Sequence, residues 1–183
     1  MITWRLVMNN TTSLLKTLYS IPANQTNCSG FIKSVALTLD PTRGLGLNGS
    51  ADAMIVDIAG HWVLVGKGSE GGPQAAACAS QGYLVIALLK AEDHLKFKFN
   101  PATKAFDIPH MYIHGHVAIV LSGPTKEGYP YLICGSIAPD GSGRSDGSQT
   151  VNHKVWRAVD APKVQYYRTS NTFAALSNTN PAK

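Results

Sequence analysis

Residues 27–39 read Asn-Cys-Ser-Gly-Phe-Ile-Lys-Ser-Val-Ala-Leu-Thr-Leu, and this stretch decides the fold because its apolar residues recur three and four positions apart. That spacing places the apolar side chains on one face of a helix. Asn27 is a favourable N-cap, since its side-chain oxygen can accept an unpaired backbone N–H of the first turn. We therefore expect Cys28 in the first turn, where the positive end of the helix dipole favours the nucleophilic thiolate.

Three further segments have helical patterns. Residues 11–20 place three leucines on one face. A helix capped by Ser50 or Asp52 is expected next, and residues 74–81 are alanine-rich and end at a glycine. The glycine-rich residues 66–72 are expected to form a loop.

After residue 82 the pattern changes from helices to strands. The unbroken apolar run 83–89 has the length of a buried strand. Residues 139–150 are dominated by Gly, Ser and Asp and are expected to form a long loop. The other predicted strands are 115–121, 131–137, 155–159 and 164–169. Helices packed on an antiparallel sheet indicate an α+β fold.

The chain is expected to form one domain over residues 1–183, since its length suits a single core and no internal repeat is present. Within it, residues 90–113 are an expected hairpin insertion, because apolar and polar residues alternate on both sides of Asn100-Pro101. The tail from about 170 to 183 is weakly patterned and is expected to be flexible.

The composition is that of a folded protein, with 44% hydrophobic and 15% charged residues and a net charge of +5. This charge suits an anionic partner such as a cell wall, or only solubility. No run of Lys or Arg supports nucleic-acid binding. No stretch is apolar enough to span a membrane, and residues 1–10 do not resemble a secretory signal. The protein is therefore expected to be made in the cytoplasm.

Cys28, Cys78 and Cys134 are an odd number of widely spaced cysteines, so at least one thiol is free. They form neither a disulfide framework nor a paired zinc motif.

A histidine at the start of a core strand is the candidate partner for the cysteine. His116 opens the predicted strand 115–121, and cysteine chemistry requires a base within hydrogen-bond reach of the sulfur. The alternative is a metal-dependent hydrolase in which His114 and His116 bind zinc, with His110 or His153 as a third ligand.

The motifs Asn-Cys-Ser-Gly-Phe at 27–31 and Gly-His-Val-Ala-Ile-Val at 115–120 resemble the NlpC-type, papain-like cysteine peptidases of bacterial cell-wall metabolism. Within that family the chain is most similar to the type VI secretion amidase effectors. The further stretches that carry this similarity are 27–36, 81–87, 115–124, 129–130, 134–138 and 155–156.

The resemblance implies a peptidoglycan amidase that needs no cofactor or metal. Cys28 would be the nucleophile and His116 the general base, and the backbone carbonyl of Cys134 would orient the imidazole. Asn27 and Ser29 would contact the substrate or its oxyanion, together with the backbone N–H of Cys28.

The same resemblance implies partners and a place of action. The protein would be injected by the secretion machinery into the periplasm of a rival bacterium, where it would hydrolyse peptidoglycan stem peptides. The bond would be either D-glutamate to diaminopimelate or the D-alanine to diaminopimelate crosslink. A cognate immunity protein would protect the producer. A peptidoglycan-binding module without catalytic activity, and a phage or housekeeping wall hydrolase, are alternatives.

Overall fold

The computed structural model describes residues 10–93, 99–100, 102, 105–106, 114–137 and 141–177. The helices are α1 (Asn10–Tyr19), α2 (Pro22–Gln25), α3 (Cys28–Leu39), α4 (Ala51–His61) and α5 (Gly68–Ser80), with short 3-10 turns at Gly44–Gly46, Ala91–Asp93, Ala161–Lys163 and Ala174–Leu176. The strands are β1 (Val63–Lys67), β2 (Tyr83–Leu89), β3 (Phe99–Asn100), β4 (Ala105–Phe106), β5 (His116–Lys126), β6 (Tyr129–Cys134), β7 (Ser145–Thr150) and β8 (Gln165–Thr172). No helix of the described residues is long and apolar enough to cross a membrane.

A six-stranded sheet in the order β1-β8-β2-β5-β6-β7 forms the centre of the protein, and every neighbouring pair is antiparallel. This confirms the predicted α+β fold with helices on an antiparallel sheet. The helices do not all precede the strands, because β1 lies between α4 and α5 and pairs with the last strand, β8.

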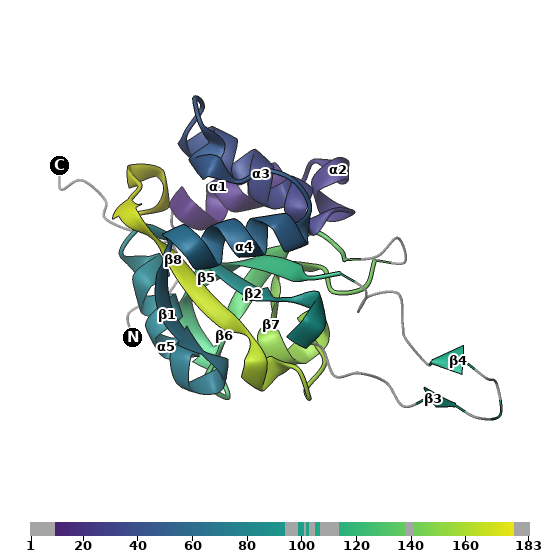
Figure 1. The fold of residues 1–183 in the computed structure, drawn as a ribbon. Helices are drawn as coiled ribbons and strands as arrows, with labels where there is room; N and C mark the ends of the chain where they lie inside the picture. The colour runs from purple at the N-terminus through teal and green to yellow at the C-terminus, as the bar shows by residue number, and fades with distance from the viewer. Residues whose placement is uncertain are drawn as a thin grey trace.

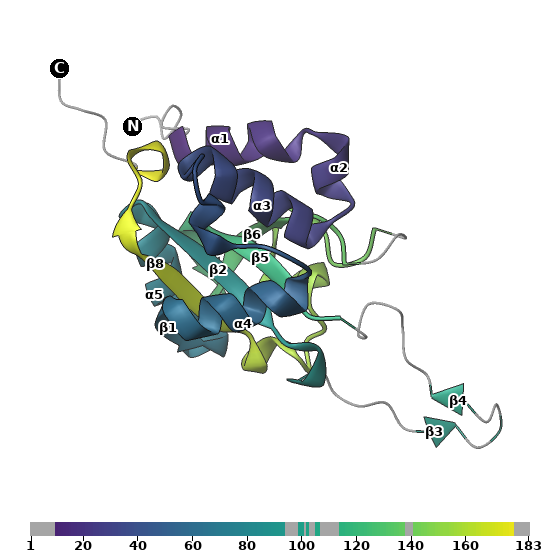
Figure 2. The ribbon, with the colours of Figure 1, turned by 45° about the horizontal axis from the view of Figure 1, so that its top comes forward.

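The two faces of the sheet are covered by different helices. α1, α3 and α4 lie over one face and α5 over the other (Figures 1 and 2). Because successive side chains of a strand point to opposite faces, the central strands β2 and β5 feed both cores. Leu84, Ile86, Leu88, Val117 and Ile119 belong to the first core, and Val85, Ala87, Leu89, Ala118 and Val120 to the second.

The first core, which we call the helical face, is built from large apolar side chains. Phe31 and Ile32 of α3 and Met54, Ile55 and Ile58 of α4 are almost completely buried. These residues recur three and four positions apart, as the sequence pattern predicts for helices packed by one face. The predicted N-caps are also confirmed, since the side chains of Asn27 and Ser50 accept backbone N–H groups of α3 and α4.

The second core, which we call the glycine face, combines buried side chains such as Tyr166 and Leu132 with a close backbone contact between α5 and the sheet. A Cβ on Gly71 would lie 2.8 Å from the Cα of Gly66, and a Cβ on Gly72 would collide with the carbonyl oxygen of Gly128. The structure therefore differs from the loop expected at residues 66–72. These glycines end β1 and begin α5, and they allow the helix to lie directly on the sheet.

Three other segments differ from the sequence-based expectations. The expected loop 139–150 ends in β7, a polar edge strand whose Ser145 Oγ donates to the Leu132 carbonyl. The expected strand 155–159 is a turn, in which Arg157 Nε donates to the buried Asp160 carboxylate at 2.7 Å. The expected flexible tail continues β8 to Thr172 and then buries Leu176 in the first core.

The expected hairpin insertion lies partly outside the described residues. Within it, β3 and β4 pair antiparallel as a separate two-stranded sheet. Residues 94–98, 101, 103–104 and 107–113 of the insertion, and residues 178–183 of the tail, are not among the described residues.

Candidate active site

The first turn of α3 is organised by the side chain of Asn27. Its Oδ1 accepts the backbone N–H of Gly30 at 2.9 Å and the hydroxyl of Ser29 at 3.0 Å. A Cβ on Gly30 would lie 3.1 Å from the Asn27 Cγ, so a residue larger than glycine would crowd the capping side chain. Asn27 Oδ1 is thus engaged as an acceptor, and the Nδ2 group of the same amide is a hydrogen-bond donor.

Cys28 is the first residue of α3 and is only 6% exposed. Burial raises the pKa of its thiol, because the charged thiolate is the form that loses solvation. A hydrogen bond from the backbone N–H of Val117, the residue after His116, lowers the pKa of the Cys28 thiol, but the effect of burial is larger. This corrects the expectation that the helix start favours the thiolate: in the free protein the thiol is the favoured form.

The backbone around Cys28 is tied to the chain that follows β6. The Cys28 N–H donates to the Ser136 carbonyl at 3.1 Å, and the Ser136 N–H donates to the Gln25 carbonyl at 2.9 Å. A Cβ on Gly135 would collide with the Asn24 carbonyl oxygen, so only glycine permits this approach. The Cys28 N–H, expected from the resemblance to bind an oxyanion, is therefore already engaged in this structure.

His116 is the first residue of β5 and is 1% exposed. Its Nε2 lies 3.0 Å from the Gly143 carbonyl oxygen, and its ring packs against Trp156 with a centroid distance of 4.9 Å. Since a carbonyl oxygen can only accept, Nε2 carries the proton and Nδ1 carries the lone pair. A base with its lone pair on Nδ1 is thus held in one tautomer and one orientation.

Cys134 lies at the end of β6 on the same side of the sheet as His116. Its thiol donates to the Gly143 carbonyl at 3.2 Å, and its Sγ lies 3.9 Å from His116 Nε2. Complete burial raises the pKa of the Cys134 thiol far above its ordinary value. The imidazole thus has a hydrogen bond to the Gly143 carbonyl, a contact that the family resemblance, which pointed to the carbonyl of Cys134, did not suggest.

Gly143 and Trp156 were not assigned a role from the sequence. Gly143 lies in the segment expected as a loop, with a positive φ of 73°. A Cβ there would lie 3.1 Å from Ile137 Cγ2 and 3.3 Å from His116 Nε2. The only hint in the sequence that Gly143 needs a special backbone conformation is its position after Gly141 and Ser142.

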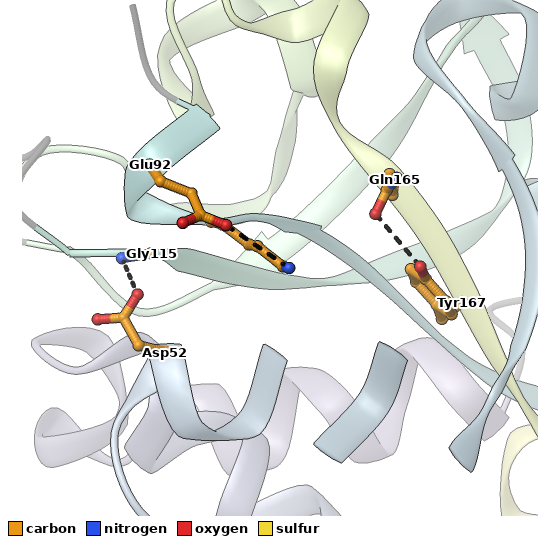
Figure 3. A network of polar contacts seen from close by, with 6 residues as sticks. Asp52, Glu92, Gly115, Gln165 and Tyr167 are labelled. Carbon is orange, nitrogen blue, oxygen red and sulfur yellow. Dashed lines mark hydrogen bonds and ion pairs between the residues drawn. The ribbon is translucent and has the colours of Figure 1, made fainter. Parts of the chain in front are cut away.

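A cleft of about 320 Å³ opens beside Cys28. It lies between the starts of α3 and α4, the segment before β5 and the segment after β6. The residues that line it are Thr26, Asn27, Cys28, Ser29, Ser50, Ala51, Asp52, His114, Gly115, Ser136 and Ile137. Figure 3 shows one contact across it, from the Asp52 carboxylate to the backbone nitrogen of Gly115.

Comparison with proteins of known function identifies the family of this chain. No protein-family model matches it. The peptidoglycan amidase Tse1 of Pseudomonas aeruginosa is 36% identical over 146 residues, which cover 79% of this chain and 75% of Tse1. This chain belongs to that amidase family. The resemblance to the type VI secretion amidase effectors is thereby confirmed, and with it the expectation of an enzyme.

In this amidase the described histidines of the alternative metal site have different partners. His114 is 67% exposed with its Nδ1 3.7 Å from Asp52 Oδ2, whereas His116 is buried against Gly143. His153 lies 3.1 Å from the Lys126 amine. Among the described residues, which do not include His110, no three His, Cys, Asp or Glu side chains gather as a metal site.

Proposed function

We propose that this amidase cleaves an amide bond of a peptidoglycan stem peptide with Cys28 as nucleophile and His116 as general base. The observation that carries the proposal is the hydrogen bond from His116 Nε2 to the Gly143 carbonyl at 3.0 Å, because it assigns the proton of the neutral imidazole to Nε2 and the basic lone pair to Nδ1. The buried Trp156 ring restrains the same imidazole. The family membership supplies the substrate class.

The reaction then follows three steps. The Cys28 thiol gives its proton to His116 Nδ1 while the sulfur attacks the amide carbonyl carbon. Because burial raises the pKa of Cys28, this transfer accompanies substrate attack rather than preceding it. His116 next gives the proton to the leaving amine as the C–N bond breaks and a thioester remains. A water activated by His116 hydrolyses the thioester and restores the thiol.

The oxyanion of the tetrahedral intermediate needs donors other than the Cys28 N–H. We assign this role to the side-chain amide of Asn27 and the backbone N–H of Ser29, both of which line the cleft. Asn27 Oδ1 accepts from Gly30 and Ser29, which orients the amide, and Nδ2 is the donor group that the amide can offer. Donors held in place before the reaction stabilise the oxyanion without reorganisation.

The fold of the site supports the NlpC-type, papain-like assignment. A cysteine at the start of a helix packs against an antiparallel sheet whose central strand opens with the histidine. We propose that residues 1–183 form this one domain. Within it, Cys134 supports the site by donating its thiol proton to the same Gly143 carbonyl that accepts from His116.

The biological setting follows from the family. We propose that the amidase is an antibacterial effector that the type VI secretion machinery delivers into the periplasm of a rival cell. A cognate immunity protein inhibits it in the cell that produces it. We assign the cut to the bond between D-glutamate and diaminopimelate, and the D-alanine to diaminopimelate crosslink is the alternative. The net charge of +5 favours contact with the anionic wall.

Digestion of purified sacculi followed by mass spectrometry tests the function and the bond together. Wild-type protein should release fragments cut at one bond type, and Cys28→Ala and His116→Ala should each lower the rate by about 10⁴-fold or more while the circular dichroism spectrum is unchanged. Cys78→Ala, which removes a buried thiol of α5 away from the cleft, is the matched control. Full activity of Cys28→Ala, or inactivation by chelators but not by iodoacetamide, would overturn the proposal.

A further inference from the structure

We infer that Asp52 is the residue that binds the free ammonium group of diaminopimelate in the catalytic cleft. This inference rests on the proposed function and adds a specificity determinant to it. The carboxylate stands at the start of α4, on the wall of the cleft opposite the start of α3.

Asp52 is the one acidic residue among the described residues that line the cleft, and no Lys or Arg lines it with them. Its side chain is 44% exposed, so it can reach a ligand while remaining partly shielded from water. A carboxylate in such a position attracts a cation more strongly than one on an open surface.

The Asp52 carboxylate is held in place by one of its two oxygens. Oδ1 accepts the Gly115 N–H at 2.8 Å, as Figure 3 shows. Gly115 permits this approach, because a Cβ there would lie 2.7 Å from Oδ1 and 2.6 Å from Ile55 Cδ1. Oδ2 lies 3.7 Å from the exposed His114 Nδ1, too far for a hydrogen bond, and so keeps its capacity to accept one.

The proposed substrate carries the group that this oxygen can bind. Diaminopimelate has two amines, and when the bond to be cut joins one of them to D-glutamate in an uncrosslinked stem, the other remains a free ammonium at the far end of the side chain. An ammonium on Asp52 would also offset the negative charge that helps to raise the pKa of Cys28. Binding of the correct substrate would therefore favour transfer of the thiol proton at the moment of attack.

The test uses a disaccharide tetrapeptide from peptidoglycan, whose single free amine is that of diaminopimelate, and the same muropeptide after N-acetylation. Wild-type protein should cleave the free-amine form with a kcat/KM about 10- to 100-fold higher, the range expected for a charge-assisted hydrogen bond. Asp52→Asn retains an oxygen for the Gly115 N–H but loses the charge, so this ratio should fall to near 1. Asp57→Asn, on the same helix but outside the cleft lining, should keep the wild-type ratio.

Each other outcome has a definite meaning. Equal cleavage of both muropeptides by the wild type would overturn the inference while leaving the proposed function intact. A loss in Asp52→Asn that is equal for both muropeptides would show that Asp52 only supports Gly115, and would also overturn it. Failure of the wild type to cleave either form would instead contradict the assigned cut between D-glutamate and diaminopimelate, and with it this inference.

Discussion

The two faces of the sheet are packed by opposite means. On the helical face, α3 and α4 fill the space with side chains such as Phe31, Met54 and Ile58. On the glycine face, α5 approaches so closely that Gly71 and Gly72 leave no room for a Cβ. The first arrangement is sensitive to lost volume and the second to added volume.

The candidate active site draws one residue from each face. Cys28 belongs to the helical core, whereas His116 packs with Trp156 and Cys134, which belong to the glycine-face core. Cys28 lies near the backbone N–H of Val117, the residue after His116, where β5 begins. The geometry of the candidate site therefore depends on how the helical face and the glycine face are positioned relative to each other at the start of β5.

The largest expected effect tests the glycine face directly. Gly72→Ala should lower the free energy of unfolding by about 3 kcal/mol, because the new methyl group would collide with the Gly128 carbonyl. Gly60→Ala, in α4 with open space around the new Cβ, should instead raise it by about 0.5 kcal/mol. Urea unfolding of both variants checks this, and equal stabilities would contradict the proposed difference between the faces.

The second prediction concerns the contribution of the helical face to catalysis. Asn27→Asp and Asn27→Ser both retain a capping oxygen but lose the amide donor, so kcat should fall by about 100-fold while the melting temperature changes little. The uncharged Ser variant controls for the added charge beside Cys28. Unchanged kcat in the Ser variant would remove Asn27 from the oxyanion site.

A smaller effect is expected from the glycine-face residue that supports the histidine. Cys134→Ala should lower kcat by less than about 10-fold, because the Gly143 carbonyl and the Trp156 ring still hold the imidazole. Steady-state kinetics on a muropeptide measures this. A loss as large as that of His116→Ala would mean that Cys134 itself takes part in the chemistry.

The smallest effect is a pH dependence at the edge where the faces meet. Since folding raises the pKa of Cys28 and Cys134, their contribution to stability is present below the unfolded thiol pKa of about 8.5 and is lost as the pH rises through the folded values. The iodoacetamide reaction of Cys28 should likewise keep accelerating above about pH 9. A plateau between about pH 6 and 7 would indicate a preformed thiolate and contradict the raised pKa.

Features set by nearby residues were predictable from the sequence. The Asn27 cap, the start of α3 at Cys28 and the apolar strand β2 depend on contacts within a few positions. The prediction of a loop at residues 66–72 was wrong because a cluster of glycines, considered without its spatial neighbours, is typical of a loop. Their real role, close packing of α5 on the sheet, involves residues more than fifty positions away, such as Gly128.

The sequence by itself determined which residues are candidates for the chemistry, and that Cys28 begins a helix and His116 a strand, because capping and periodicity are local. Only the tertiary structure decided their surroundings. It placed the Gly143 carbonyl against His116, and it engaged the Cys28 N–H with Ser136. The pKa of the Cys28 thiol is also raised and not lowered as the helix start predicts, since the effect of burial is larger than that of the helix dipole.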